Sequence, residues 1–150
     1  MNTQNTQNTQ NAENAENAEN AETRRIMTAR FNHTIIASKI PADMAVFYID
    51  ILEAAPAESW GIFTNVTIGD GVMLQFAEVT WEYSPQHYAY LVDDGHFDRA
   101  LRTLRERSIE FWAGPQRQQP GEINHGHDGR GVYFLDPSGH YLELITHPYL

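Results

Sequence analysis

The chain has 150 residues, a formal charge of −10 and no cysteine. The lack of cysteine excludes disulfides and thiolate sites, so any metal must be held by imidazole, carboxylate or amide groups. The acidic charge disfavours nucleic acid and anionic membranes as partners, because both favour clustered Lys and Arg. No apolar run approaches the roughly 18 residues of a membrane span, and no signal-peptide pattern is visible. We expect a cytoplasmic protein that acts on a small molecule.

The N-terminal segment is a tripeptide repeat over residues 2–22, first NTQ and then NAE. It contains no aromatic and no β-branched aliphatic residue. Such a segment cannot bury enough apolar surface to offset the entropy lost on ordering. The sequence therefore predicts a disordered low-complexity tail over 1–26 and a single domain over 27–150.

The first half of that domain predicts a strand, a helix and a hairpin. The β-branched stretch 31–38 is typical of a strand, and "PADMAVFYIDIL" at 41–52 has Pro at a helix start, followed by apolar residues at helical spacing. "WGIFTNVTIG" at 60–69 indicates one or two strands. "DG" at 70–71 predicts a hairpin turn, and 72–79 is the return strand.

The second half repeats this order. "HYAYLV" at 87–92 is typical of a strand, and Asp94 is the expected cap of a helix whose Asp98 and Arg102 have ion-pair spacing. A Gly/Pro-rich segment is followed by two more strands joined by the turn "DPSG". We therefore predict an α+β fold with two paired βαβββ modules, at about 30–79 and 87–148. Together they would form a cupped mixed sheet around a central cavity, with the helices outside.

Two polar residues interrupt apolar strands at equivalent positions of the two halves. Gln75 follows Gly71 by four residues, and Glu143 follows Gly139 by four residues. An unpaired buried carboxylate costs several kcal/mol. Glu143 therefore needs a partner, and a metal ion is one candidate.

Two histidines form a second equivalent pair. His33 and His87 each begin the first strand of their half, just before its helix. If the modules pair face to face, these imidazoles converge with Glu143 and Gln75. Two imidazoles and a carboxylate form a facial triad for a divalent ion such as Fe, Mn, Zn or Ni. Gln75 is either a fourth ligand through its carbonyl oxygen or a hydrogen-bond donor beside the site.

The segment "GEINHGHDGRG" at 121–131 allows two interpretations. In one it is a lid, in which His125 is a general acid or base oriented by Asn124, and Arg130 binds an anionic group of the substrate. In the other it is a solvated glycine-rich loop, and Arg130 makes a surface ion pair.

Residues 30–148 resemble the vicinal oxygen chelate superfamily, which includes glyoxalase I, fosfomycin and bleomycin resistance proteins and extradiol dioxygenases. The resemblance rests on "FNHTII", "LQF", "HYAYLV" and, most specifically, "YFLDPSGHYLELIT". It implies paired βαβββ modules around a metal, with ligand positions at His33, Gln75, His87 and Glu143. It also implies a substrate bound through two neighbouring oxygens, a dioxygenase-like or lyase/isomerase-like reaction, and a homodimer.

Two alternatives remain open on the sequence. A metal-free drug- or small-ligand-binding resistance protein would use an acidic, aromatic-lined pocket for a cationic ligand. A structural relative with no ligand would pair its polar strand residues internally. Metal analysis of the purified protein distinguishes the metalloenzyme from both.

Overall fold

The computed structural model describes residues 28–69 and 71–149. The predicted tail over 1–26 and Asp70 of the expected turn lie outside the described residues. Residues 32–150 form one compact unit. Among the described residues, no helix has both the length and the apolar character needed to cross a membrane.

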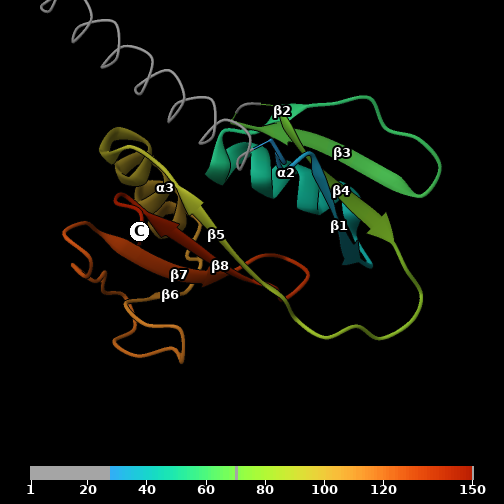
Figure 1. Cartoon of the computed structure of the whole chain (residues 1–150). Coiled ribbons are helices and arrows are strands. Elements are labelled where there is room, and N and C mark those ends of the chain that lie inside the picture. The colour runs from blue at the N-terminus through green and yellow to red at the C-terminus, as the bar shows by residue number, and fades with distance from the viewer. Residues whose placement is uncertain (1–27, 70, 150) are drawn as a thin grey trace, which may run out of the picture. The chain divides into compact units, whose positions relative to one another are not determined.

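The compact unit contains two modules with the same order of elements (Figure 1). The first comprises β1 (His33–Ser38), α2 (Pro41–Leu52), β2 (Ala55–Pro56), β3 (Phe63–Ile68) and β4 (Val72–Glu78). The second comprises β5 (His87–Leu91), α3 (Asp94–Glu106), β6 (Phe111–Trp112), β7 (Gly131–Leu135) and β8 (Tyr141–Ile145).

The sheet topology is also duplicated. One sheet has the order β1-β4-β3-β2 and the other β5-β8-β7-β6. In each, the first strand pairs in parallel with the last, and the remaining pairs are antiparallel. The predicted α+β fold of paired βαβββ modules is confirmed.

Both predicted helices are present, with one change at a terminus. α2 begins at Pro41 as expected, and Glu53 ends it with a left-handed backbone, φ 52°. α3 is capped by Asp93 rather than Asp94, because the extended backbone at Asp93 lets its carboxylate accept from the His96 amide at 2.7 Å. Asp98 pairs with Arg130 rather than with Arg102.

One face of each sheet packs on the helices. Ile36 and Phe76 of the first sheet and Leu142 and Leu144 of the second are fully buried. α2 also contacts α3, and both modules contribute to a single hydrophobic cluster. Because successive strand residues alternate between faces, Gln75 and Glu143 point away from this core.

The turn between β7 and β8 links the two modules through polar contacts. Tyr48 of α2 donates to Asp136 Oδ2 at 3.1 Å, and Ser38 and Ser138 share a hydrogen bond of 2.7 Å between their hydroxyls. Burial is the main cause that raises the pKa of Asp136 and that of Tyr48. The "DPSG" turn therefore has a structural role between the modules in addition to reversing the chain.

Candidate functional site

The structure brings His87 and Glu143 together. Nε2 of His87 lies 3.1 Å from Oε2 of Glu143. The histidine begins β5, and the glutamate lies in the middle of β8, where it pairs with Ala89. The His87 side chain is 47% exposed and that of Glu143 only 4%, so a buried carboxylate and an accessible imidazole meet at the surface.

The chemistry of this pair fits a divalent ion. Among the described residues, no Lys or Arg nitrogen lies within 4.0 Å of the Glu143 carboxylate, which instead contacts His87 and the Tyr149 hydroxyl. A buried carboxylate without a cation is costly, and an ion beside it would offset that cost. Imidazole nitrogen and carboxylate oxygen are both ligands of first-row divalent metals.

His33 has the hydrogen bond expected of a metal-binding histidine. Its Nδ1 lies 2.8 Å from Oδ1 of Asn32. Because an amide oxygen only accepts, Nδ1 carries the proton, and in the neutral ring the lone pair is on Nε2. Fixing one ring nitrogen in this way is how proteins orient an imidazole toward a metal.

Gln75 is oriented by Asn65, which lies outside the predicted ligand set. Its Nε2 donates to Asn65 Oδ1 at 3.4 Å, and Asn65 Nδ2 donates to the Glu58 carbonyl oxygen at 2.7 Å. The amide nitrogen of Gln75 is thus committed, which leaves its carbonyl oxygen for a ligand. The signal for Asn65 was a second polar residue within an apolar strand, paired with Gln75 across β3 and β4.

The four predicted ligands are divided between the two sheets. His33 and Gln75 lie on β1 and β4, and His87 and Glu143 on β5 and β8. The register is the same in both sheets, since Gln75 pairs with Ile35 and Glu143 with Ala89. Within 28–69 and 71–149, no three His, Asp or Glu side chains are arranged so that they could hold a metal ion. One chain therefore carries two matching halves of the predicted ligand set.

The 124–131 segment is an ordered hairpin. Asn124 and Gly131 exchange two backbone hydrogen bonds of 2.9 Å. The Asn124 side chain donates to the Ala113 carbonyl oxygen and accepts from the Gly126 amide. His125 is exposed and has no hydrogen bond to another described residue, so its expected role in proton transfer stays a prediction.

Arg130 makes ion pairs at the base of the hairpin. Its guanidinium lies 2.6 Å from Asp94 Oδ1 and 2.6 Å from Asp98 Oδ1. It also covers the Phe97 ring at 4.5 Å. Hydrogen bonds to the two carboxylates raise its pKa despite partial burial. These contacts support the ion-pair interpretation of Arg130 over an anion-binding one.

Two tyrosines lie beside Glu143: Tyr133, whose strand position in the sequence allows either the cavity or the core, and Tyr149, which is outside the predicted set. Tyr133 pairs with Glu143 across β7 and β8, and Tyr149 donates its hydroxyl to Glu143 Oε1. Burial, followed by the interaction with Glu143, raises the pKa of both phenols. Both therefore remain protonated near neutral pH. Tyr149 lies beyond the last strand, where strand periodicity gives no signal.

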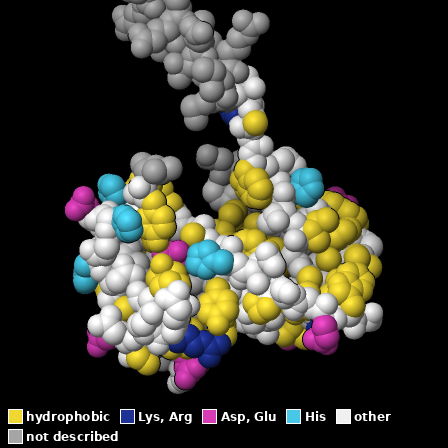
Figure 2. Space-filling view, turned by 60° about the horizontal axis from the view of Figure 1, so that its bottom comes forward, with side chains coloured by type: hydrophobic (Ala, Val, Ile, Leu, Met, Phe, Trp, Pro, Cys, Tyr) yellow, Lys and Arg dark blue, Asp and Glu magenta, His cyan; other side chains and the backbone are white. Residues whose placement is uncertain are grey.

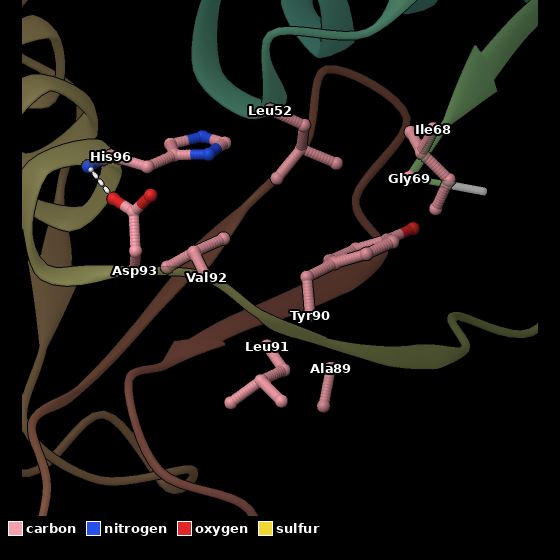
Figure 3. Close-up of a pocket in the computed structure, with 9 residues that line it drawn as sticks. All are labelled: Leu52, Ile68, Gly69, Ala89, Tyr90, Leu91, Val92, Asp93 and His96. Carbon is pink, nitrogen blue, oxygen red and sulfur yellow. Dashed lines mark hydrogen bonds between the residues drawn. The ribbon is translucent and has the colours of Figure 1, made fainter.

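A pocket of about 400 Å³ lies at the edge of β5 (Figure 3). It is next to the end of α2, the β3–β4 turn and the start of α3, and neither His87 nor Glu143 lines it. Its walls are mainly apolar, with Asp93 and His96 as polar members, and His96 is bonded to the Ile51 carbonyl oxygen at 2.9 Å. We assign the candidate chemistry to His87 and Glu143, because the pocket has no matching set of ligands.

Comparison with known proteins identifies the family. The family model described as "Glyoxalase/Bleomycin resistance protein/Dioxygenase superfamily" matches residues 30–144. A solved structure, "Oxidase ChaP-H2", is 43% identical with a TM-score of 0.78, and the match covers 82% of this chain and 97% of that chain. "Glutathione transferase FosA" of Serratia marcescens is 28% identical over 124 residues, which are 79% of this chain and 81% of that protein. The fosfomycin resistance protein FosX of Mesorhizobium loti, 19% identical with a TM-score of 0.60 over 82% of this chain and 95% of that chain, shares the fold. The chain belongs to the glyoxalase/bleomycin resistance protein/dioxygenase superfamily.

Proposed function

We propose that the protein is a metal-dependent oxidase of this superfamily, in which His33, His87 and Glu143 hold a divalent ion. The observation that carries the proposal is the 3.1 Å contact between His87 and the buried carboxylate of Glu143. Two histidines and one carboxylate are the ligand set of non-haem iron oxygenases. The solved structure that is 43% identical is named an oxidase, which favours iron over Mn, Zn or Ni.

The proposed site is completed by a second copy of the chain. Ile35 and Leu91 are 54% and 59% exposed, and they lie on the same sheet faces as His33 and His87. β1 and β5 are also edge strands, with unpaired backbone groups along one side. Figure 2 shows several patches of exposed hydrophobic side chains on the face in view. Such surfaces favour a homodimer, in which each site takes His33 and Gln75 from one chain and His87 and Glu143 from the other.

The residues around the proposed site have separate tasks. Bound there, a divalent ion would polarise two neighbouring oxygens of a small substrate, and iron would add redox chemistry. Gln75 offers its carbonyl oxygen, either directly to the ion or to a water beside it. Tyr149 keeps its proton and donates a hydrogen bond to Glu143. Tyr133 also keeps its proton and lies opposite Glu143 across β7 and β8. His125, exposed on its hairpin, is the candidate for moving a proton of the substrate.

Sequence similarity favours an oxidase over a thiol transferase such as FosA, because the solved structure named an oxidase is 43% identical and FosA is 28% identical. Several cations of this chain are also paired with carboxylates, which makes them less available to an anionic thiol such as glutathione. The single lysine, Lys39, is paired with Glu82. Arg99, Arg107 and Arg130 are each paired with at least one carboxylate as well.

Metal analysis of protein purified without added metal tests this function. We expect stoichiometric iron, and an EPR signal when the Fe(II) protein is exposed to nitric oxide, which occupies the position open to dioxygen. Glu143→Ala should lose the metal, whereas Glu122→Ala, which removes an exposed carboxylate elsewhere, should retain it. Stoichiometric metal in Glu143→Ala would contradict the ligand assignment. Wild-type protein that binds no divalent metal would favour a metal-free binding protein instead.

A further inference from the structure

We propose that Tyr149 is a positioning residue for Glu143, and that the hairpin 124–131 holds Tyr149 in place through His127. In this arrangement the Tyr149 hydroxyl occupies one carboxylate oxygen, so that Glu143 presents only the other to the ion. The inference rests on the proposed metal site and adds a residue that the ligand set does not include.

The two carboxylate oxygens of Glu143 have different partners. Oε1 accepts a hydrogen bond from the Tyr149 hydroxyl. Oε2 lies 3.1 Å from His87 Nε2. Because a phenol has one proton to donate, Tyr149 can satisfy Oε1 but cannot compete for Oε2. The two oxygens of the carboxylate therefore have different roles: Oε1 accepts the hydrogen bond from Tyr149, and Oε2 faces His87 and is the oxygen that would bind the ion.

Tyr149 is placed by contacts with the hairpin. Its ring centroid lies 4.4 Å from that of His127. Arg130 and Thr146 exchange two hydrogen bonds, one from the Arg130 amide to the Thr146 hydroxyl at 2.9 Å and one from the Thr146 amide to the Arg130 carbonyl oxygen at 3.0 Å. These bonds attach the segment that leads to Tyr149 to the base of the hairpin.

Gly129 permits this close approach. A Cβ added to Gly129 would lie 2.7 Å from His147 Cβ and 3.0 Å from the His147 amide nitrogen. The hairpin is therefore packed closely against Thr146 and His147. This packing fixes the backbone two residues before Tyr149.

The expected consequence concerns how Glu143 binds an ion. A carboxylate with one oxygen held in a hydrogen bond binds a metal through its other oxygen, which leaves one more coordination position for substrate. Hydrogen-bond partners of this kind also orient the ligand, and their loss typically weakens metal binding about 10- to 100-fold.

Cobalt(II) titration of the full chain tests the role of Tyr149, with Co²⁺ as the probe and its visible absorption as the readout. Tyr149→Phe removes the hydroxyl and keeps the ring against His127, so the fold should be unaffected. We expect Co²⁺ to bind about 10- to 100-fold more weakly, with a lower absorption intensity as Glu143 becomes bidentate and the coordination number rises. Tyr83→Phe, which removes the hydroxyl that donates to the Ser138 carbonyl oxygen, is the matched control and should bind Co²⁺ as the wild type does.

A second variant tests the hairpin. His127→Ala keeps the Tyr149 hydroxyl but removes the ring that packs on it, so we expect a weakening in the same direction. If the wild type binds Co²⁺ and Tyr149→Phe has the same affinity and spectrum, the role of Tyr149 is overturned but the metal site is not. Wild-type protein that binds no Co²⁺ would overturn the proposed metal site itself, and the two failures are thus distinguishable.

Discussion

His140 joins the two modules by donating from Nε2 to the Ala37 carbonyl oxygen at 2.9 Å. Its Nδ1 accepts from the Gln86 amide at 3.0 Å, so this nitrogen must be unprotonated and the proton resides on Nε2. The ring is 1% exposed. A single neutral histidine thus connects the end of β1 with the start of β5, next to His87.

Replacing His140 should destabilise the protein. His140→Ala leaves the Gln86 amide and the Ala37 carbonyl oxygen without their partner and creates a cavity, which together cost about 2–4 kcal/mol. Urea unfolding followed by circular dichroism measures this change. His147→Ala, which removes an exposed histidine, should change the free energy of unfolding by less than about 0.5 kcal/mol. Equal effects of the two variants would contradict the linking role of His140.

Asp136 should make stability depend on pH. Its pKa is raised above the ordinary value of 3.8, mainly by burial. At a pH between the ordinary pKa of the unfolded state and the raised pKa of the folded state, the folded state binds more protons. The free energy of unfolding therefore falls as the pH rises through this range. Unfolding of metal-free wild type and Asp136→Asn across pH 4–7 isolates this contribution. The free energy of unfolding of the wild type should fall relative to that of the variant as the pH rises. If it rises instead, the folded state stabilises the ionised carboxylate of Asp136.

Arg130 should contribute to stability and not to substrate binding. Arg130→Gln removes both ion pairs and the contact with Phe97, and we expect the free energy of unfolding to fall by about 1 kcal/mol. Metal content should stay at the wild-type level. The matched control is Arg102→Gln. Arg102 lies on the same helix as Asp98, but Asp98 pairs with Arg130, so this variant should keep the wild-type stability. An Arg130→Gln protein with unchanged stability would contradict this assignment.

Gly129 and Gly126 form a matched pair of glycines on the hairpin. Gly129→Ala would place a methyl group against the His147 backbone, whereas a Cβ at Gly126 would meet only the Asn124 side chain at 3.5 Å. We expect Gly129→Ala to cost about 1–3 kcal/mol and to weaken Co²⁺ binding by displacing Tyr149. Gly126→Ala should be close to neutral. Thermal unfolding and Co²⁺ titration measure both effects, and similar behaviour of the two variants would contradict the tight packing at Gly129.

Local sequence patterns predicted the fold well, because alternation and helical spacing are local signals. They gave the bounds of α2, the duplicated modules and the equivalence of Gln75 and Glu143, which the strand register confirms. The same patterns assigned the ligands to the two modules, but they could not show whether one chain brings these halves of the ligand set together or keeps them divided. That division depends on how the modules pack, through long-range contacts such as Tyr48 with Asp136.

Residues that act through other residues were harder to predict. Asn65 and Tyr149 each contact one predicted ligand, and their positions depend on cross-strand pairing or on packing beyond the last strand. The capping residue of α3 was misplaced by one position, since Asp93 and Asp94 are chemically identical and only backbone geometry distinguishes them.

Subunit mixing tests the central claim most directly, namely that two chains complete one metal site. His33→Ala and Glu143→Ala should each lose stoichiometric iron when purified alone. If the two proteins are unfolded together and refolded at equal concentrations, half of the dimers are mixed and each has one intact site.

We therefore predict that about a quarter of the wild-type metal content is recovered in that mixture. The control mixes His87→Ala with Glu143→Ala, which lie in the same half of the ligand set, and should recover none. No recovery in the first mixture, with the wild type fully loaded after the same refolding, would contradict the two-chain site.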